Sequence, residues 1–179
     1  MNTSQKVFMG CKNNDRQAQE QLYRDFYPDL MRISLRYVNN KDDAQDLVNR
    51  AMLKVFITLD SFRGDVSTLG GWTRRIFINE CLDFIRRQKA FSQHCELSDT
   101  IQEYGEHSFR WEEDDPEELL VLLKVLPVLP RTVFNLFIVE GYGHKEIAEM
   151  LAISVANSKW NLHIARKEMK QLISEKQML

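Results

Sequence analysis

The sequence has little of the chemistry on which cross-linked or metal-bound folds depend. Its three cysteines, Cys11, Cys81 and Cys95, are odd in number and widely spaced, with no CxxC pair. A disulfide framework needs paired cysteines, and a structural zinc site needs closely spaced pairs of ligands. His94 lies beside Cys95, but no second pair of ligand residues accompanies it. We therefore expect no disulfide, no bound metal and no cofactor.

Long apolar runs and a secretion leader are also missing. The most apolar stretch, Leu119 to Leu129, is interrupted by Lys124 and Pro127. It is far shorter than the roughly 20 apolar residues that a helix needs to cross a bilayer. The chain does not open with a basic, apolar and cleavable leader. These features predict a cytoplasmic protein.

The usual marks of an enzyme are absent from the sequence. There is no glycine-rich loop that could cradle phosphates, no set of metal ligands and no nucleophile motif. The four histidines are scattered among the many carboxylates. Catalysis is therefore the least favoured class of function, and we expect no enzymatic activity.

What the chain does have is the composition of a helical protein. Only seven glycines and four prolines punctuate its 179 residues, of which 44% are hydrophobic and 28% charged. Leu, Ile, Glu, Lys and Arg are abundant, and these residues suit helices. The alternation of apolar and polar residues that marks a strand is never sustained. We predict an all-α fold with one or two small domains.

The charge of the chain is unevenly distributed. Residues 1–92 carry 15 Lys and Arg against 11 Asp and Glu, a net charge of +4, and residues 119–179 carry 8 against 5, a net +3. Residues 93–118 carry 1 against 10, a net −9. A like-charge segment with little helical periodicity is typical of a linker. We predict helical domains at 1–92 and 117–179, joined by an acidic linker at 93–116. The linker is either a solvated tether or an acidic strand that occupies a basic channel on a partner.

Apolar spacing predicts four helices in the first domain. The first covers about 3–11, and the second is capped by Asp15 and runs to about Tyr37, with a bend at Pro28. The third covers about 42–59, and the fourth begins after the glycines of a turn and covers 72–91.

The second domain also reads as four helices. They are expected at 116–126, from after Pro130 to about Gly141, at 144–152, and after Ser154, which can cap the last one. The final two form either a helix-turn-helix or a plain helical hairpin. Their turn, "AIS", lacks the glycine that is usual there. Ala152 is a small residue and an acceptable substitute if its backbone is not strongly left-handed.

The fourth helix of the first domain carries residues that suit nucleic acid. Arginines, an amide and a carboxylate recur three and four residues apart, which places them along one side of a helix. Arginine neutralises phosphates, asparagine can bond a base edge, and aromatic rings can stack on an unpaired base. The candidates are Phe62, Trp72, Arg74, Arg75, Asn79, Asp83, Arg86 and Arg87. The alternative is an ordinary solvated helix, with Trp72 and Phe77 in the core.

The last helix offers a second candidate surface. Val155, Leu162, Ala165 and Met169 are expected to pack inward. Asn157 can reach a base edge in the major groove, and the basic side chains suit phosphates. The candidate DNA-binding residues are Ser154, Ala156, Asn157, Lys159, Trp160, His163, Arg166 and Lys167. Trp160 has two interpretations: an apolar contact with another helix or an inhibitor, or a contact with DNA sugar or methyl groups.

Three segments occur together in an order that is typical of one family. "DAQDLVNRAMLKVF", "SFRGDVSTLGGWTRRIFINECLDFIRR" and the C-terminal hairpin resemble, in order and separation, a bacterial extracytoplasmic-function (ECF) sigma factor. The resemblance covers nearly the whole chain. It implies a subunit that binds core RNA polymerase and selects promoters. The first domain would contact the β′ clamp and the minus-10 element, and the second the β flap and the minus-35 element. It further implies an anti-sigma factor as regulator.

The resemblance also assigns individual residues. The surface that grips the clamp corresponds to Asp43, Asp46, Leu47, Asn49 and Lys54. The family usually has Gln-Glu where this chain has Asn49 and Arg50, so Arg50 reverses a charge there. Residues 62–71, including Ser67 and Thr68, correspond to the loop that sets minus-10 specificity, and Asn79 to the pocket for a flipped base.

Some positions depart from the family's pattern. The specificity loop, which contains Gly70 and Gly71, is about one residue longer than expected. Asn161 and Ile164 stand where the family often has arginine, and Trp160 where a small serine is common. Each lost phosphate contact lowers the salt slope of binding by about 0.9. We therefore expect the last helix to attract DNA weakly.

Two other functions are compatible with the residues. A stand-alone helix-turn-helix regulator would bind an operator as a symmetric dimer, but the sequence has no heptad segment for dimerisation. We therefore expect no stable homo-oligomer. A helical adaptor with no role on DNA is the other alternative, in which reversal of the arginine charges would leave activity intact.

Overall fold

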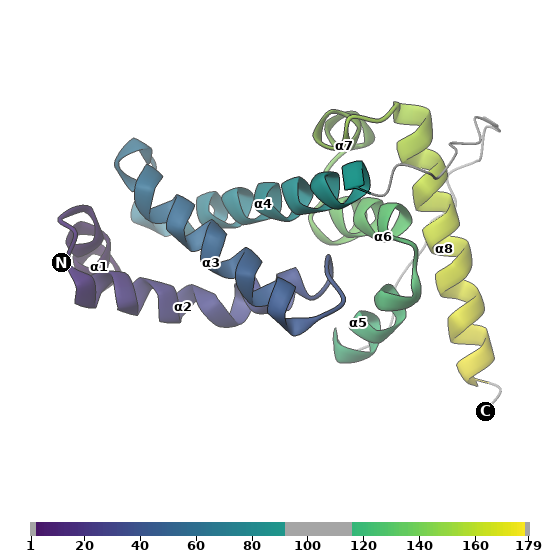
Figure 1. The fold of residues 1–179 in the computed structure, drawn as a ribbon, viewed down its shortest axis with the longest axis horizontal. Coiled ribbons are helices and arrows are strands. Elements are labelled where there is room, and N and C mark those ends of the chain that lie inside the picture. The colour runs from purple at the N-terminus through teal and green to yellow at the C-terminus, as the bar shows by residue number, and fades with distance from the viewer. Residues whose placement is uncertain (1–2, 92–115, 178–179) are drawn as a thin grey trace. The chain divides into compact units, whose positions relative to one another are not determined.

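The computed structural model describes residues 3–91 and 116–177, and both ranges are helical without a strand (Figure 1). The predicted all-α class is therefore confirmed. The chain divides into two compact units, Met1–Phe84 and Ile85–Leu179, with the boundary inside the helix Leu69–Phe91. The acidic segment predicted as a linker lies almost wholly outside the described residues.

The first unit begins with three helices, α1 (Thr3–Lys12), α2 (Arg16–Ser34) and α3 (Lys41–Thr58). The Asp15 carboxylate caps α2 as predicted, because its Oδ1 accepts the Gln17 amide at 2.8 Å. Helix α2 continues through Pro28. Asn40 caps α3 by accepting the amide of Asp43 at 2.7 Å. These side chains satisfy amides that have no partner within the helix.

The segment between α3 and α4 is short and partly helical. It holds two 3-10 turns, η1 (Leu59–Ser61) and η2 (Val66–Thr68), and α4 (Leu69–Phe91) follows at once. The predicted start at Trp72 was wrong by three residues. Leu69 is buried and anchors the helix start in the core. Gly70 and Gly71 belong to the first turn of α4, where glycine is less costly than in the interior of a helix.

The core of the first unit fixes which side of α3 faces outward. Its apolar stripe is almost completely buried and consists of Ala44, Leu47, Val48, Ala51, Met52 and Val55. Each large side chain buried in this way contributes about 1.5–3 kcal/mol of transfer free energy. Turning α3 about its axis would expose this stripe, so the opposite side of the helix is held at the surface.

The second unit contains α5 (Pro116–Val125), α6 (Val128–Phe134), a π-helical turn η3 (Asn135–Val139), α7 (His144–Leu151) and α8 (Val155–Gln177). The predicted start of α6 after Pro130 was late, because Pro130 fits its first turn, where a missing amide costs nothing. The predicted stop near Gly141 is confirmed, and Gly141 has a φ of 78°.

Helices α7 and α8 form the predicted helix-turn-helix. The Ile153 amide bonds the Ala148 carbonyl at 3.0 Å and the Ala152 amide bonds the Glu149 carbonyl at 3.4 Å, which is the Schellman pattern. Ala152 takes the left-handed position of that motif, with φ 52° and ψ 49°. The condition under which alanine would be an acceptable substitute is therefore not met. Alanine there carries a strain of roughly 1–2 kcal/mol that glycine would not.

The packing of α8 follows the prediction except at its start. Leu162, Ala165 and Met169 are buried, but Val155, the first residue of the helix, is 38% exposed. Ser158 and Asn161 occupy the buried side instead. The Ser158 hydroxyl bonds His144 Nδ1 at 2.9 Å, so a polar contact joins α7 to α8.

Candidate nucleic-acid and protein interfaces

Helix α4 presents a polar side that suits a nucleic acid. Arg75, Asn79 and Arg86 are exposed, and Asp83 is half-buried. Their spacings of four and three residues place all four along one side of α4. Arg74 and Arg87 are also exposed and flank that side. An amide between guanidinium groups can bond a base edge while the cations meet phosphates.

The turn before α4 adds two exposed hydroxyl groups. The Asp65 carboxylate accepts the Ser67 amide at 2.9 Å, and the Thr68 hydroxyl donates to the Asp65 carbonyl at 2.8 Å. Hydrogen bonds from the Ser67 hydroxyl and amide lower the pKa of Asp65. The aspartate therefore holds the turn in shape and leaves Ser67 and Thr68 at the surface.

The aromatic residues near this turn are not equivalent. Phe62 is only 7% exposed and belongs to the core cluster, with its ring centroid 5.7 Å from that of Phe8. The structure does not support its predicted role as a stacking surface for a base, because the core already covers it. Trp72 is half-buried against Phe62, with ring centroids 5.2 Å apart. Trp72 is therefore the aromatic candidate that remains.

Helix α8 brings five predicted residues together on its outward side. Lys159, Trp160 and Lys167 are exposed, and Ala156 and His163 are half-buried. We call these five residues the α8 strip. The rings of Trp160 and His163 are stacked, with centroids 5.8 Å apart and planes at 18°.

Three other predicted residues of α8 have structural roles. The Ser154 hydroxyl accepts the Asn157 amide at 3.0 Å and so caps the helix. The Asn157 side-chain oxygen accepts a short hydrogen bond from Asn161 Nδ2, which uses one of the acceptor sites that a base could otherwise meet. The half-buried Arg166 guanidinium lies 5.9 Å from the Phe137 ring centroid, so it is drawn away from the predicted phosphate contact.

The outward side of α3 is mixed, with ion pairs beside apolar side chains. Arg50 pairs with Asp46 at 3.1 Å, and Asn49 accepts the Tyr23 hydroxyl at 2.8 Å. Leu53 and Ile57 are 60% and 72% exposed. Because residues 46, 50, 53 and 57 are spaced by three and four, they share one side of the helix.

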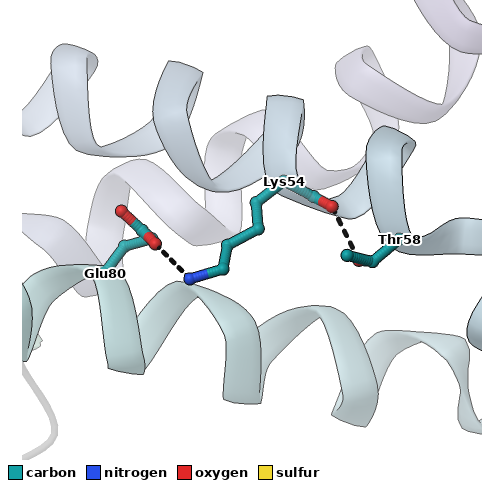
Figure 2. A network of polar contacts seen from close by, with 3 residues as sticks. All are labelled: Lys54, Thr58 and Glu80. Atoms are coloured by element: carbon teal, nitrogen blue, oxygen red, sulfur yellow. Dashed lines mark hydrogen bonds and ion pairs between the residues drawn. The ribbon is translucent and has the colours of Figure 1, made fainter.

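Two residues predicted to grip a partner on α3 are placed otherwise. Leu47 is completely buried, because it belongs to the inward stripe. Its predicted contact with a clamp is therefore wrong. Lys54 donates to Glu80 on α4 at 2.7 Å, and the Thr58 hydroxyl donates to the Lys54 carbonyl at 2.6 Å (Figure 2). The Lys54 ammonium therefore ties α3 to α4.

The part of the chain that the structure describes contains no cluster of three or more His, Cys, Asp or Glu side chains that could hold a metal ion. None of its helices is long and apolar enough to cross a membrane.

Two family models match the segments that carry these surfaces. Residues 22–91 match sigma-70 region 2, and residues 117–169 match sigma-70 region 4. The two matches occur in the family's order and together span more than half of the chain. The chain belongs to the sigma-70 family. It is a sigma factor of the ECF kind, as its relatives also indicate.

The sequences of similar proteins match most of the length of this sigma factor. The RNA polymerase sigma factor SigV of Bacillus subtilis is 28% identical over 152 residues, which are 84% of this chain and 89% of the relative. The ECF RNA polymerase sigma factor SigM of Mycobacterium tuberculosis is 29% identical over 159 residues, 89% of this chain and 79% of the relative. The solved structure of the sigma factor RpoE in complex with the anti-sigma factor NepR, from Bartonella quintana, has a TM-score of 0.53 and 22% identity. It covers 87% of this chain and 96% of that chain.

The family match divides the candidate residues of the sigma factor into two sets. All candidates on α3, α4 and the turn between them fall in region 2, and the α8 strip falls in region 4. Sequence reasoning missed Leu53 and Ile57, although a signal was present. Both lie off the inward stripe of α3 yet are large and apolar, a combination that is typical of interaction surfaces.

Proposed function

We propose that this ECF sigma factor is a removable, non-catalytic subunit of RNA polymerase that acts in the cytoplasm. It binds the polymerase through α3, reads the minus-10 element with α4 and reads the minus-35 element with α8. The observation that carries the proposal is the presence of two separate DNA-compatible surfaces, one in each sigma region of one chain. Two readers on one chain suit a promoter with two spaced elements.

The proposed contact with the β′ clamp centres on Leu53 and Ile57. They are exposed at adjacent turns of α3, with the Asp46–Arg50 pair one turn away. Apolar anchors with a polar rim are the usual form of a protein interface. Asp43, Asp46 and Asn49 belong to that rim in our proposal. Arg50 is already neutralised by Asp46, which makes its charge reversal tolerable at this surface.

The proposed minus-10 reader is the polar side of α4 with Ser67, Thr68 and Trp72. Asn79 lies on that side between Arg75 and Arg86 and meets a base that has left the stack. Extraction of a base costs a few kcal/mol, which hydrogen bonds and stacking must return. Asn79→Ala is therefore expected to impair promoter opening more than polymerase binding. An equal loss in both assays would contradict this assignment.

The proposed minus-35 reader is the α8 strip, in which Lys159 and Lys167 meet phosphates. With only these two cations at its surface, the strip needs the polymerase and α4 for affinity. Val121 and Val125, one turn apart on α5, are 64% and 63% exposed, and we assign them to the β flap.

An anti-sigma factor is the regulator that we propose. The similar structure of RpoE contains the anti-sigma factor NepR, and its 22% sequence identity with this chain supports a shared fold. The exposed apolar residues of α3 and α5 supply surfaces that such an inhibitor would have to cover to prevent polymerase binding. Sedimentation of the free chain is expected to show no stable homo-oligomer.

Binding experiments with purified core polymerase test the function directly. The chain is expected to associate with core and to give it sequence-specific DNA binding that neither component has alone. The alternative, a stand-alone helix-turn-helix regulator, predicts tight operator binding by a dimer without polymerase. Specific binding by the chain alone, unchanged by core, would overturn the sigma proposal.

A further inference from the structure

The rings of Trp160 and His163 stack against each other at the middle of the α8 strip. The two planes are within 18° of parallel, and Trp160 is 36% exposed. Ser158, Leu162 and Ala165 occupy the opposite, buried side of the helix. The rings are therefore turned away from the core that holds α8 in place.

The neighbours of this ring pair place it against nucleic acid. Lys159 precedes Trp160, and Lys167 follows His163 by one turn on the same strip. Cations on both sides of an aromatic pair would bring phosphates to its edges. An inhibitor that covered the rings by apolar contact alone would also have to desolvate those two ammonium groups, at a cost. Charge complementarity thus favours DNA as the occupant.

The chemistry of the rings limits what they can read. Tryptophan offers a single N–H donor and no acceptor, and the two ring nitrogens of histidine point in different directions, so neither ring can form the paired hydrogen bonds that identify guanine or adenine. A flat apolar ring instead suits the thymine C5-methyl group, the one apolar feature that a base pair presents in the major groove.

We infer that the Trp160–His163 pair recognises thymine through its methyl group in the minus-35 element. The inference rests on the proposed function, since it requires α8 to lie in the major groove. Burial of one methyl group is worth a change of about fourfold in affinity. The preference would replace part of the binding energy that an arginine-poor strip cannot obtain from phosphates.

Uracil tests the inference because it differs from thymine by that methyl group alone. Promoters are first selected by the holoenzyme from random DNA and then remade with deoxyuridine in place of thymidine in the minus-35 element. The wild-type holoenzyme is expected to bind the deoxyuridine promoter about fourfold more weakly for each methyl contacted. Trp160→Ala is expected to bind both DNAs equally.

A matched control separates methyl recognition from general loss of affinity. Lys159→Ala alters the neighbouring exposed residue and is expected to weaken both DNAs alike, so it retains the deoxyuridine penalty. Thermal unfolding of each variant checks that the unit still folds. Equal wild-type binding to both DNAs, a full penalty in Trp160→Ala, or selected minus-35 elements without thymine would each overturn the inference.

Failure of the proposed function has a different signature. In a footprint, the holoenzyme would then leave the DNA upstream of the start unprotected at the minus-35 position, whichever base is present. Protection of that position without discrimination between thymine and uracil would sink the methyl inference alone.

Discussion

Removal of the apolar side chains of Leu53 and Ile57 should release the sigma factor from core polymerase without unfolding it. They are 60% and 72% exposed in the free chain, so an interface can bury most of both. Complete burial of such a side chain contributes about 1.5–3 kcal/mol. Scaled by the exposed fraction, and with the methyl group that alanine retains, Leu53→Ala/Ile57→Ala should cost about 2 kcal/mol, a roughly 30-fold weaker affinity.

Fluorescence anisotropy of the labelled chain, titrated with core enzyme, measures this loss. Met9→Ala is the matched control, because Met9 is an apolar side chain on α1 that is 43% exposed. It should leave core affinity unchanged. The double variant and the control should unfold at similar temperatures, since neither alters a buried residue. Core affinity within twofold of wild type for a folded double variant would refute the assignment of α3 to the polymerase.

Further predictions concern stability and salt. Ala152→Gly should stabilise the chain by about 0.5–1 kcal/mol in a denaturant titration, because relief of left-handed strain exceeds the added entropy of the unfolded state; a loss of stability would contradict the strain. Burial, together with the negative charge of Asp15, raises the pKa of the Cys11 thiol to about 11. The unfolded thiol ionises near pH 8.5, so the free energy of unfolding should fall as pH rises from about 9 to about 11. The free energy of unfolding of Cys11→Ala should not show this fall between pH 9 and about 11. Identical pH profiles for the variant and the wild type would contradict the role of the Cys11 thiol. Lys159→Ala and Lys167→Ala should each reduce the salt slope of promoter binding by about 0.9 in filter-binding assays; an unchanged slope would remove that lysine from the DNA surface.

Much of the fold could be predicted from the sequence, because local signals and tertiary packing agree. Asp15 and Ser154 cap the helices at which they stand, and the apolar stripe of α3 is buried as its spacing indicates. Gly141 ends its helix with a positive φ. At these positions each residue has a single favourable structural role, so the sequence alone indicates it.

The errors occur where a residue could satisfy two roles. Leu47 matched a family interface by position, but its spacing puts it on the inward stripe, and burial prevails. Lys54 matched the same interface by position, yet its ammonium group forms an ion pair with Glu80 on another helix. Ala152 shows the converse, because the Schellman geometry holds a residue that the local backbone disfavours. Of these three roles, only that of Lys54 depends on a contact between segments distant in sequence, because the spacing of Leu47 and the Schellman bonds beside Ala152 are local.

The candidate DNA surfaces could be predicted only in part from the spacing of residues along the helices. Spacing predicted an outward side of α8 that contains the α8 strip together with Asn157 and Arg166. It could not show that Arg166 lies over the Phe137 ring or that Asn157 and Asn161 bond each other. It also could not distinguish Phe62, which the core covers, from Trp72, which keeps part of its ring at the surface. These distinctions depend on burial.

Run-off transcription from a genomic DNA library measures whether the chain directs RNA polymerase to promoters. Core RNA polymerase is supplied with and without the chain, and the 5′ ends of the transcripts are sequenced. A sigma factor should produce a new set of start sites, which share two spaced upstream elements and appear only when the chain is present. An unchanged set of starts, with no association between the chain and core, would contradict this expectation.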